Sequence, residues 1–529
     1  AAYQRGYRTP FTQRTLLMVN GIIDNHLWTH EANISRQYPL SNIERVEVLY
    51  GPASAVYGPN AFLGIINIIT KDAHLLESGG QNAQVNAHIG SYNTHSVDAA
   101  LQGRVGELSY ALSGRVFRSD EADLSDQWGF LSNDLYSNRD IWGPILDLEH
   151  RNEPYGSYQD PTDDWGVMGE LGLHGLEVGM ISWDRKEAYG PYYAADRAQN
   201  NTMWNKSSRQ TYARYTRALN DNLTSKTLLL YRESRVWGGW IEGAPDEEDS
   251  SWISITNWHS LSNSWLFREN LEYRLGTNLQ VLGGVKYERK ELTKAYEIPG
   301  YWDGAYSSQA VEPGSAIGYS TDKTYTPGPL PPSEMGPDNL ALTEDLGGFV
   351  LGIYDLQPLR FNAGIRYDQN SLYGSSINPR ASAIFKFNDD QGAVKLMYGE
   401  AFQEPAPIQL WGGWEGRAAN PDLQPEKARN FEAMTMYQTA GVSNEISAYY
   451  ATYENVIKEE AENAGERQIT GVEYRARASL VNPIPSSDKI SLYGNYTFTN
   501  AVSSIDYDHD AGAWVNREVT LGDIAPHTV

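Results

Sequence analysis

From about Gln84 onward, hydrophobic and polar residues alternate along the chain with a period of two. In one segment Leu108, Leu112 and Val116 alternate with Ser109 and Ser113. Segments of the same kind occupy residues 359–368, 472–478 and 490–499. Alternation over about ten residues predicts β-strands that have one apolar face. This pattern fits a soluble sandwich, whose apolar face is its core, and equally a membrane barrel, whose apolar face contacts lipid.

The links between these segments alternate in length. Among about seventeen candidate strands between residues 84 and 500, short links are expected at residues 104–106, 174–175, 219–222, 276–278, 357–358, 388–392 and 440–444. Longer links are expected at residues 119–164, 185–208, 237–261, 291–344 and 400–428. Short turns at one end and long loops at the other are typical of an up-and-down barrel in an asymmetric membrane. Neither a sandwich nor a propeller explains this regularity.

The first 75 or so residues follow a different pattern. Residues 15–19 form a short apolar segment that meets Asn20-Gly21, a pair that favours a tight hairpin into Ile22 and Ile23. Residues 43–49 and 65–69 are further candidate strands, separated by glycines. We therefore predict a small mixed α/β unit before the all-β domain.

Composition narrows the class of protein. The net charge of −25 argues against nucleic acid and against docking on anionic lipid through basic patches. There is no cysteine, so no disulfide or thiolate metal site is needed. The mean hydropathy is −0.52, and no apolar run is long enough for a transmembrane helix. A membrane protein this polar is expected only as a β-barrel whose alternate residues face a wet lumen.

Residues 43–58, with the sequence Ile-Glu-Arg-Val-Glu-Val-Leu-Tyr-Gly-Pro-Ala-Ser-Ala-Val-Tyr-Gly, and the following residues 65–71 carry the most specific signal. They resemble the core of the plug domain of TonB-dependent outer-membrane transporters. Further elements resemble this family in its order along the chain: Arg5-Gly6, residues 16–22, Asn378-Pro379-Arg380, residues 401–405, residues 420–426 with Phe431-Glu432, Gly471-Val472-Glu473 and Pro526-His527-Thr528.

The resemblance implies an all-β membrane protein, a large antiparallel up-and-down transmembrane β-barrel with a small α/β N-terminal plug domain in its lumen. We place the plug at residues 1–78 and the barrel at residues 79–529. Transporter barrels of this family have about 22 strands. We therefore expect that the chain lacks parts of both termini, including the segment before Ala1 that would bind TonB.

The family further implies active transport of a scarce, bulky solute across the bacterial outer membrane. A ferric siderophore comes first among the expected solutes, followed by cobalamin and oligosaccharides. The expected partners are TonB with ExbB-ExbD on the periplasmic side, outer-membrane lipid and lipopolysaccharide, and the small-molecule ligand. No enzyme motif and no intrinsic cofactor are found, so a ferric chelate would enter only as ligand. A surface receptor or adhesin without transport and a secreted carbohydrate-active β-protein remain as alternatives.

In the family, plug arginines pair with barrel glutamates and hold the plug in the lumen. This chain departs from the pattern, since Tyr50 stands where an arginine usually precedes the Gly-Pro pair. The plug–barrel contacts are therefore expected from the remaining arginines of the plug and the glutamates of the family elements, namely Arg5 and Arg45 with Glu426, Glu432 or Glu473.

Candidate ligand-binding residues come from a plug loop and from aromatic-rich barrel loops. By resemblance, the loop with His26, Trp28 and His30 faces the ligand cavity. The other candidates are Tyr57, Asn60, Tyr301, Trp302, Trp411 and Trp414. A solvated polar loop, or loops packed on their own aromatic side chains, would give the same sequence. Two histidines four residues apart share one face of a helix, but the flanking Asn25 and Pro39 favour a loop, so no metal site is predicted.

Two acidic segments are weaker candidates for Ca²⁺. Asp506, Asp508 and Asp510 lie on one side of an extended segment, and residues 246–249 are all acidic. The EF-hand pattern fails, because Ala511 stands where a glycine is needed. Solvated acidic loops are the favoured interpretation of both segments.

Overall fold

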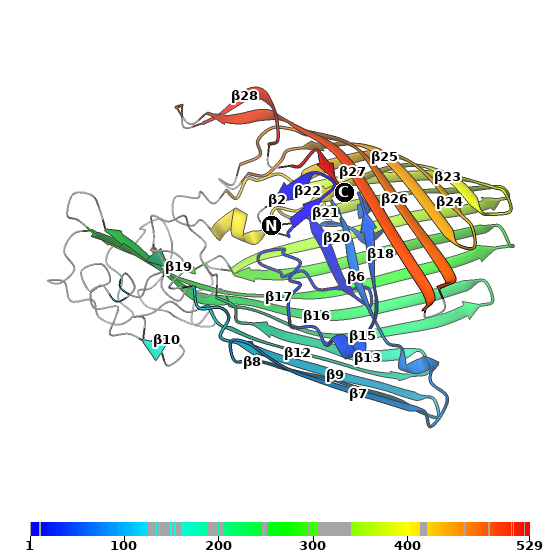
Figure 1. Ribbon diagram of the computed structural model, residues 1–529, viewed down its shortest axis with the longest axis horizontal. Coiled ribbons are helices and arrows are strands. Elements are labelled where there is room, and N and C mark those ends of the chain that lie inside the picture. The colour runs from blue at the N-terminus through cyan, green and yellow to red at the C-terminus, as the bar shows by residue number, and fades with distance from the viewer. Residues whose placement is uncertain are drawn as a thin grey trace.

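The computed structural model describes residues 2–9, 12–124, 134, 137, 149–150, 153–154, 160–188, 198–199, 205–245, 251–293, 296–303, 340–412, 420–458, 462–484, 487–508, 510–511, 513–522 and 524–529. They form a small N-terminal unit and a large antiparallel sheet that curves into a barrel around it. Figure 1 shows the long strands of the barrel wall lying along the longest axis of the molecule.

The N-terminal unit contains a four-stranded mixed sheet in the order β4-β3-β6-β5. Its strands are β3 (Thr15–Val19), β4 (Ile22–Ile23), β5 (Ile43–Tyr50) and β6 (Gly64–Thr70). Strands β3 and β6 are parallel, whereas the other two pairs are antiparallel. The expected hairpin is confirmed, because Asn20 and Gly21 adopt φ values of 50° and 77° between β3 and β4.

Short elements complete this unit. They are β1 (Ala2–Gln4), β2 (Tyr7–Thr9), η1 (Leu40–Asn42), α1 (Ser54–Tyr57) and η2 (Ala73–Leu75). Leu17, Val19 and Ile22 of the sheet pack on Trp183 and Leu230 of the barrel. We call this unit the plug, since its buried core is continuous with side chains that point inward from the wall.

The wall is built from seventeen strands of ten or more residues within the described part of the chain, and each pairs antiparallel with its neighbours. They are β7 (Gln81–Gly90), β8 (Thr94–Val105), β9 (Leu108–Ser119), β12 (Thr162–Leu173), β13 (Leu176–Arg185), β15 (Asn205–Asn220), β16 (Leu223–Pro245), β17 (Ser251–Leu275), β18 (Leu279–Thr293), β20 (Leu340–Leu356), β21 (Leu359–Asn370), β22 (Gly374–Phe387), β23 (Gly392–Gln403), β24 (Glu426–Gln438), β25 (Val442–Glu454), β26 (Arg467–Ile484) and β27 (Ser487–Asp508).

Shorter strands join this wall, namely β14 (Ala198–Gln199), β19 (Tyr296–Asp303), β28 (Ala513–Thr520) and β29 (His527–Thr528). A separate two-stranded sheet is formed by β10 (Glu149–His150) and β11 (Glu153–Pro154). A π-helical segment, η8 (Ile408–Gly412), lies between β23 and β24. The helices of the described residues include none that is both long and apolar enough to cross a membrane.

Side-chain exposure shows whether the alternating pattern belongs to a soluble sandwich or to a membrane barrel. On β9, Leu112 is 55% exposed, whereas Ser113 next to it is 2% exposed. On β17, Ser262 and Ser264 are fully buried, whereas Trp265 is 63% exposed. The apolar residues therefore face outward and the small polar residues face the plug. A soluble sandwich would show the reverse, so the alternation is that of a barrel whose outer face suits lipid.

The predicted short links are confirmed as tight turns. Each of the seven falls between consecutive long strands, as at β8–β9, β12–β13, β15–β16, β17–β18, β20–β21, β22–β23 and β24–β25. Figure 1 shows these turns at the end of the barrel opposite to β19. We call the two ends the turn end and the loop end.

Two of the predicted loops are wrong in part. Residues 237–261 do not form one long link, since β16 continues to Pro245 and β17 begins at Ser251, with an unbroken register between them. The expected loop at residues 291–344 contains strand β19, which pairs with β17. In both places the hydrogen-bonded strand pairing extends farther along the chain than the sequence predicts.

The close approach of the plug to the wall at Gly166 gives a first prediction. A Cβ atom at this position of β12 would lie 2.0 Å from the carbonyl oxygen of Gln37 in the plug. Gly166→Ala should therefore displace the plug and lower the free energy of unfolding by about 1–3 kcal/mol. Thermal unfolding and protease cleavage of the plug measure this effect.

Gly169→Ala on the same strand is the matched control. Its added Cβ would meet neighbours at an ordinary 3.7 Å. Equal melting temperatures for the two variants would contradict the proposed close approach.

Candidate functional site: the plug–barrel interface

A buried ion pair joins the plug to β24. Arg14, just before β3, donates to Glu426 through Nε at 2.6 Å and through Nη2 at 2.5 Å, and also to the carbonyl oxygen of Ile457 at 3.1 Å. The Glu426 side chain is fully buried and that of Arg14 is 8% exposed. Burial disfavours the charged guanidinium, but the Glu426 carboxylate outweighs this effect and raises the pKa of Arg14 above its ordinary value.

A second ion-pair cluster lies nearby. Arg5 donates to both carboxylate oxygens of Glu432, at 2.9 and 2.8 Å, and to Glu473 at 3.3 Å. Tyr50 lies between two cations, since its ring centroid is 5.6 Å from the guanidinium carbon of Arg5 and 5.4 Å from that of Arg475 on β26. The tyrosine that replaces the usual arginine thus contacts a barrel arginine through its ring face.

The structure contains only some of the plug–barrel contacts that were predicted. The structure brings Arg5 together with Glu473 and Glu432, and it pairs Glu426 with Arg14 instead of either expected arginine. The prediction for Arg45 is wrong, because this residue pairs with Glu47 of its own strand and both side chains are at least half exposed. Strand β5 lies at one edge of the plug sheet, and nearly all of its side chains are exposed.

Asp24, after the β3–β4 hairpin, is the centre of a third buried contact. It accepts hydrogen bonds from the hydroxyl of Tyr38 at 2.6 Å, from Nε1 of Trp183 on β13 at 3.1 Å, and from the side-chain amide of Gln210 on β15. Asp24 is fully buried. Burial raises the pKa of Asp24 from its ordinary 3.8 to about 6, although the three donors oppose the shift.

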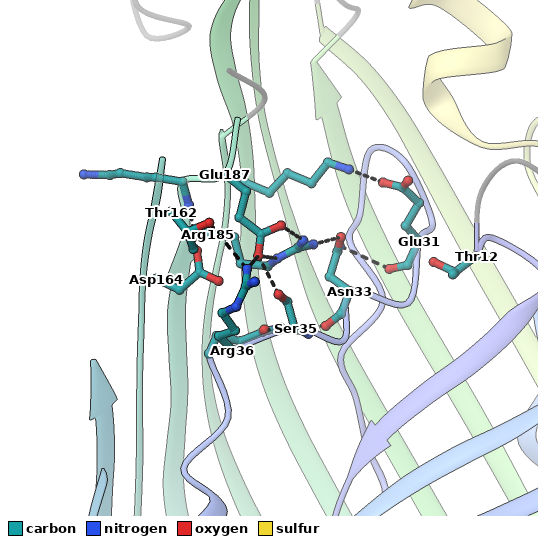
Figure 2. Close-up of polar contacts among 12 residues, drawn as sticks. Thr12, Glu31, Asn33, Ser35, Arg36, Thr162, Asp164, Arg185 and Glu187 are labelled. Carbon is teal, nitrogen blue, oxygen red and sulfur yellow. Dashed lines mark hydrogen bonds and ion pairs between the residues drawn. The ribbon is translucent and has the colours of Figure 1, made fainter. Parts of the chain in front are cut away.

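The loop that follows makes a polar network with the rim of the wall, as Figure 2 shows. Arg185 of β13 donates to Asn33 at 2.8 Å and also pairs with Glu187. Ser35 donates to Glu187, and Glu31 accepts from Lys206 of β15. Every charged group in this set therefore has an opposite charge beside it, which fixes the loop against the loop-end half of β12–β15.

The predicted ligand residues His26, Trp28 and His30 lie beneath this rim and are buried, with exposures of 0%, 0% and 7%. Nδ1 of His26 accepts from the backbone N–H of Trp28 at 3.3 Å, and Nε2 lies 3.2 Å from the carbonyl oxygen of Arg235. This network assigns the proton of the ring to Nε2. Both ring nitrogens are thus occupied by the protein.

Burial, together with nearby Lys206, lowers the pKa of His26 to about 3, and burial with nearby Lys290 does the same for His30. Both rings are therefore neutral at physiological pH. The expectation of a ligand-facing loop stays a prediction, and in this structure the loop is covered, for example by Ile408, which donates to the carbonyl of Trp28 at 3.2 Å.

The other predicted residues are scattered. Asn60 accepts from the backbone of Glu404 at 3.2 Å and lies beside a buried cluster in which Lys290 pairs with Asp345 at 2.6 Å and with Glu404 at 3.2 Å. Tyr57, at the end of α1, is 42% exposed within the lumen. Trp411 is part of η8 and packs against Leu410, Leu423 and Ile457.

Tyr301 and Trp302 do not lie in an irregular loop as expected, since they pair with β17 as part of strand β19. Trp414 and residues 246–249 lie outside the described residues. Asp506 pairs with Arg517, and Asp508 caps the backbone N–H of Asp510 at 3.0 Å. In the described ranges no group of three or more His, Cys, Asp or Glu residues could hold a metal ion.

Sequence reasoning missed Arg14 and Asp24, which carry two of the strongest contacts. The sequence gives little indication of their role, because each is a single charged residue next to an apolar strand. Their partners Glu426 and Gln210 lie 412 and 186 positions away along the chain. Together these ion pairs and hydrogen bonds join the plug to β24 and β26 and to β13 and β15.

Comparison with known proteins agrees with this architecture. Residues 140–529 match the family described as TonB dependent receptor-like, beta-barrel, and residues 2–65 match the TonB-dependent Receptor Plug Domain. The vitamin B12 transporter BtuB of Photobacterium profundum is 22% identical over 430 residues, which are 80% of this chain and 55% of that protein. The chain therefore spans about half the length of this relative.

Solved structures share the fold. The siderophore receptor PiuA from Acinetobacter baumannii superimposes with a TM-score of 0.64 at 14% identity, over 97% of this chain and 75% of that one. The ferric-catecholate import receptor Fiu from E. coli K12 gives a TM-score of 0.63 at 16% identity with the same coverage. At these identities the likeness concerns the fold alone.

The buried pair Arg14–Glu426 gives a second prediction. Arg14→Met leaves the Glu426 carboxylate buried without a counter-charge and should destabilise the seated plug by about 3–5 kcal/mol. Adding Glu426→Gln should recover most of this loss, because no unpaired charge remains. Since the chain contains no cysteine, Ser54→Cys places a single thiol at a fully buried plug position, and its labelling by maleimide reports plug release.

Arg45→Met is the control for this series, because it removes an exposed pair whose loss should cost about 1 kcal/mol or less. If Arg14→Met and Arg45→Met labelled at the same rate, the buried pair would have no special part in seating the plug.

The raised pKa of Asp24 gives a third prediction. Between pH 6 and pH 4 the folded protein binds a proton at Asp24 that the unfolded chain, with the ordinary pKa of 3.8, does not bind. This group therefore adds stability as the pH falls through about 6, and the gain is complete near pH 4. Asp24→Asn should remove this contribution, about 1–3 kcal/mol in the difference between pH 7 and pH 4.

The measurement is thermal unfolding of parent and Asp24→Asn across this pH range. Asp389→Asn, at an exposed turn, is the control. The neutral histidines oppose the trend in the parent and the variant alike, so the difference between the two isolates Asp24. Parallel pH profiles for parent and Asp24→Asn would refute the assignment.

Proposed function

Because this chain belongs to the TonB-dependent receptor family, we propose that it takes part in active uptake of a scarce, bulky solute across the bacterial outer membrane. The observation that carries the proposal is the plug, seated in the lumen by ion pairs that join Arg5 and Arg14 to β24 and β26. Members of this family are not enzymes, so the carbohydrate-active alternative is set aside.

In the proposed cycle, the loop end faces outside and the turn end faces the periplasm. A solute binds at the loop end, and TonB, energised through ExbB-ExbD, pulls on a segment before the plug. The plug–barrel ion pairs would be the first contacts to bear this force, since Arg5 and Arg14 are the charged anchors nearest to that segment. Outer-membrane lipid and lipopolysaccharide would contact the apolar outer face of the wall.

For the solute we propose a ferric siderophore first. The similar structures include proteins named as siderophore and ferric-catecholate receptors, which supports a ferric chelate. The curated relative named as a vitamin B12 transporter supports cobalamin as the second candidate. No intrinsic cofactor is proposed.

A fourth prediction tests the transport and its solute. Iron starvation of the source organism should raise the abundance of this protein in outer membranes several-fold, and deletion of its gene should abolish uptake of a radiolabelled ferric catecholate. A protonophore should stop uptake while leaving binding to cells intact, because the proton gradient drives only the release step.

The proposed solute and the proposed transport can each be contradicted by one result. Unchanged abundance under iron starvation together with loss of labelled cobalamin uptake in the deletion strain would replace the siderophore by cobalamin. Binding without any protonophore-sensitive uptake would favour a surface receptor or adhesin over a transporter.

A further inference from the structure

A cavity of about 210 Å³ lies between the plug and the wall, away from the loop end. On the plug side it is lined by Gly21 and Ile23 of the hairpin and by Tyr57 of α1. On the other side it is lined by strands β16, β17, β18, β20 and β21, which Figure 1 shows along the wall. Arg268 lies seven residues before the last residue of β17, Leu275, so the cavity belongs to the half of the lumen nearer the turn end.

Most basic residues that line this cavity pair with a carboxylate, but within the described residues one of them does not. Lys286 pairs with Glu288 at 2.9 Å, Arg366 pairs with Asp368 at 2.7 Å, and Lys226 pairs with Glu272 at 3.7 Å. Arg268 forms no ion pair with any carboxylate in the part of the chain that the structure describes. Its guanidinium donates only to the carbonyl oxygen of Gly21, at 3.4 Å.

Nearby acids are already occupied. Glu269 points to the other side of β17 and accepts from Ser225 and Thr227, and Glu272 also pairs with Arg274 at 2.9 Å. The lack of a carboxylate partner for Arg268 among the described residues is not due to a shortage of carboxylates, since the chain has 67 acidic and 42 basic residues. A half-buried cation without a counter-ion keeps its positive charge available to an anion.

The surroundings indicate what kind of anion would fit. Ile23, Leu266 and Phe349 supply apolar surface beside the guanidinium. The hydroxyl-bearing ring of Tyr57 also lines the cavity. The volume is smaller than that of sites for drug-sized ligands, about 300 Å³ or more. It suits one carboxylate on a small apolar body rather than a whole bulky solute.

We propose that this cavity is a binding site for a small organic carboxylate, with Arg268 as the charged anchor and the hydrophobic side chains of the wall and hairpin around its apolar body. A bound carboxylate would connect Arg268 of the wall with the plug hairpin. The site lies on the turn-end side of the plug and is distinct from the loop-end surface where the transported solute is proposed to bind. It does not depend on the proposed transport.

Calorimetric titration of the purified full chain in a non-ionic detergent tests this site, with benzoate as probe and benzyl alcohol as its neutral counterpart. We expect benzoate to bind at least about tenfold more tightly than benzyl alcohol, because only the anion can pair with Arg268. Arg268→Gln should weaken benzoate binding by about tenfold or more, whereas Arg268→Lys should retain most of it.

The matched control is Arg217→Gln, which removes an exposed wall arginine of β15 that does not line the cavity and should leave benzoate affinity unchanged. Equal benzoate affinity of Arg268→Gln and the parent would overturn the proposal, as would equal affinities of the parent for benzoate and benzyl alcohol. The second comparison needs no variant and so holds even if Arg268→Gln fails to fold. Because no TonB and no transported solute are present, failure of this test leaves the proposed uptake untouched.

Discussion

The structure depends on the pairing of plug arginines with barrel glutamates inside an enclosed lumen. Arg14 and Glu426 are almost completely removed from solvent, and Arg5 contacts two carboxylates that are also largely buried. Each charge would be strongly unfavourable alone, so the plug and the wall are stable only in the register that brings them together. Such pairs add more to the specificity of the seated arrangement than to its free energy.

The same constraint explains why the interior of this protein is polar. A wall strand must satisfy lipid on one face and the plug on the other, and the buried serines at positions 260, 262 and 264 of β17 give the inner face small polar side chains. Apolar contacts between plug and wall gather in two clusters, one with Leu17 against Trp183 and the other with Tyr7 and Phe62 against Tyr453. The interface therefore combines directional polar contacts with two hydrophobic clusters.

The fold could be predicted from the sequence to a large extent because its rules are local. The period of two indicated the strands, the short links fell at tight turns, and Asn20-Gly21 formed the expected hairpin. The site could be predicted only in part. Arg5 was found through a family element, but the partner of Glu426 was not, because no local pattern distinguishes Arg14 from other arginines. The burial of His26 was also missed, since a polar loop that is covered by a wall has the same sequence as one that is open to solvent.

The distance along the chain between the paired charges has a consequence for biogenesis. Arg5 and Glu473 are 468 positions apart, and Arg14 and Glu426 are 412 apart. The plug leaves the ribosome first, yet its counter-charges lie on strands that are made several hundred residues later. Contacts of such long range form slowly, because the intervening chain must be ordered before they contribute. Arg5 and Arg14 of the plug therefore lack these carboxylate partners until the barrel forms. The plug can take its final position only after β24 and β26 have joined the wall.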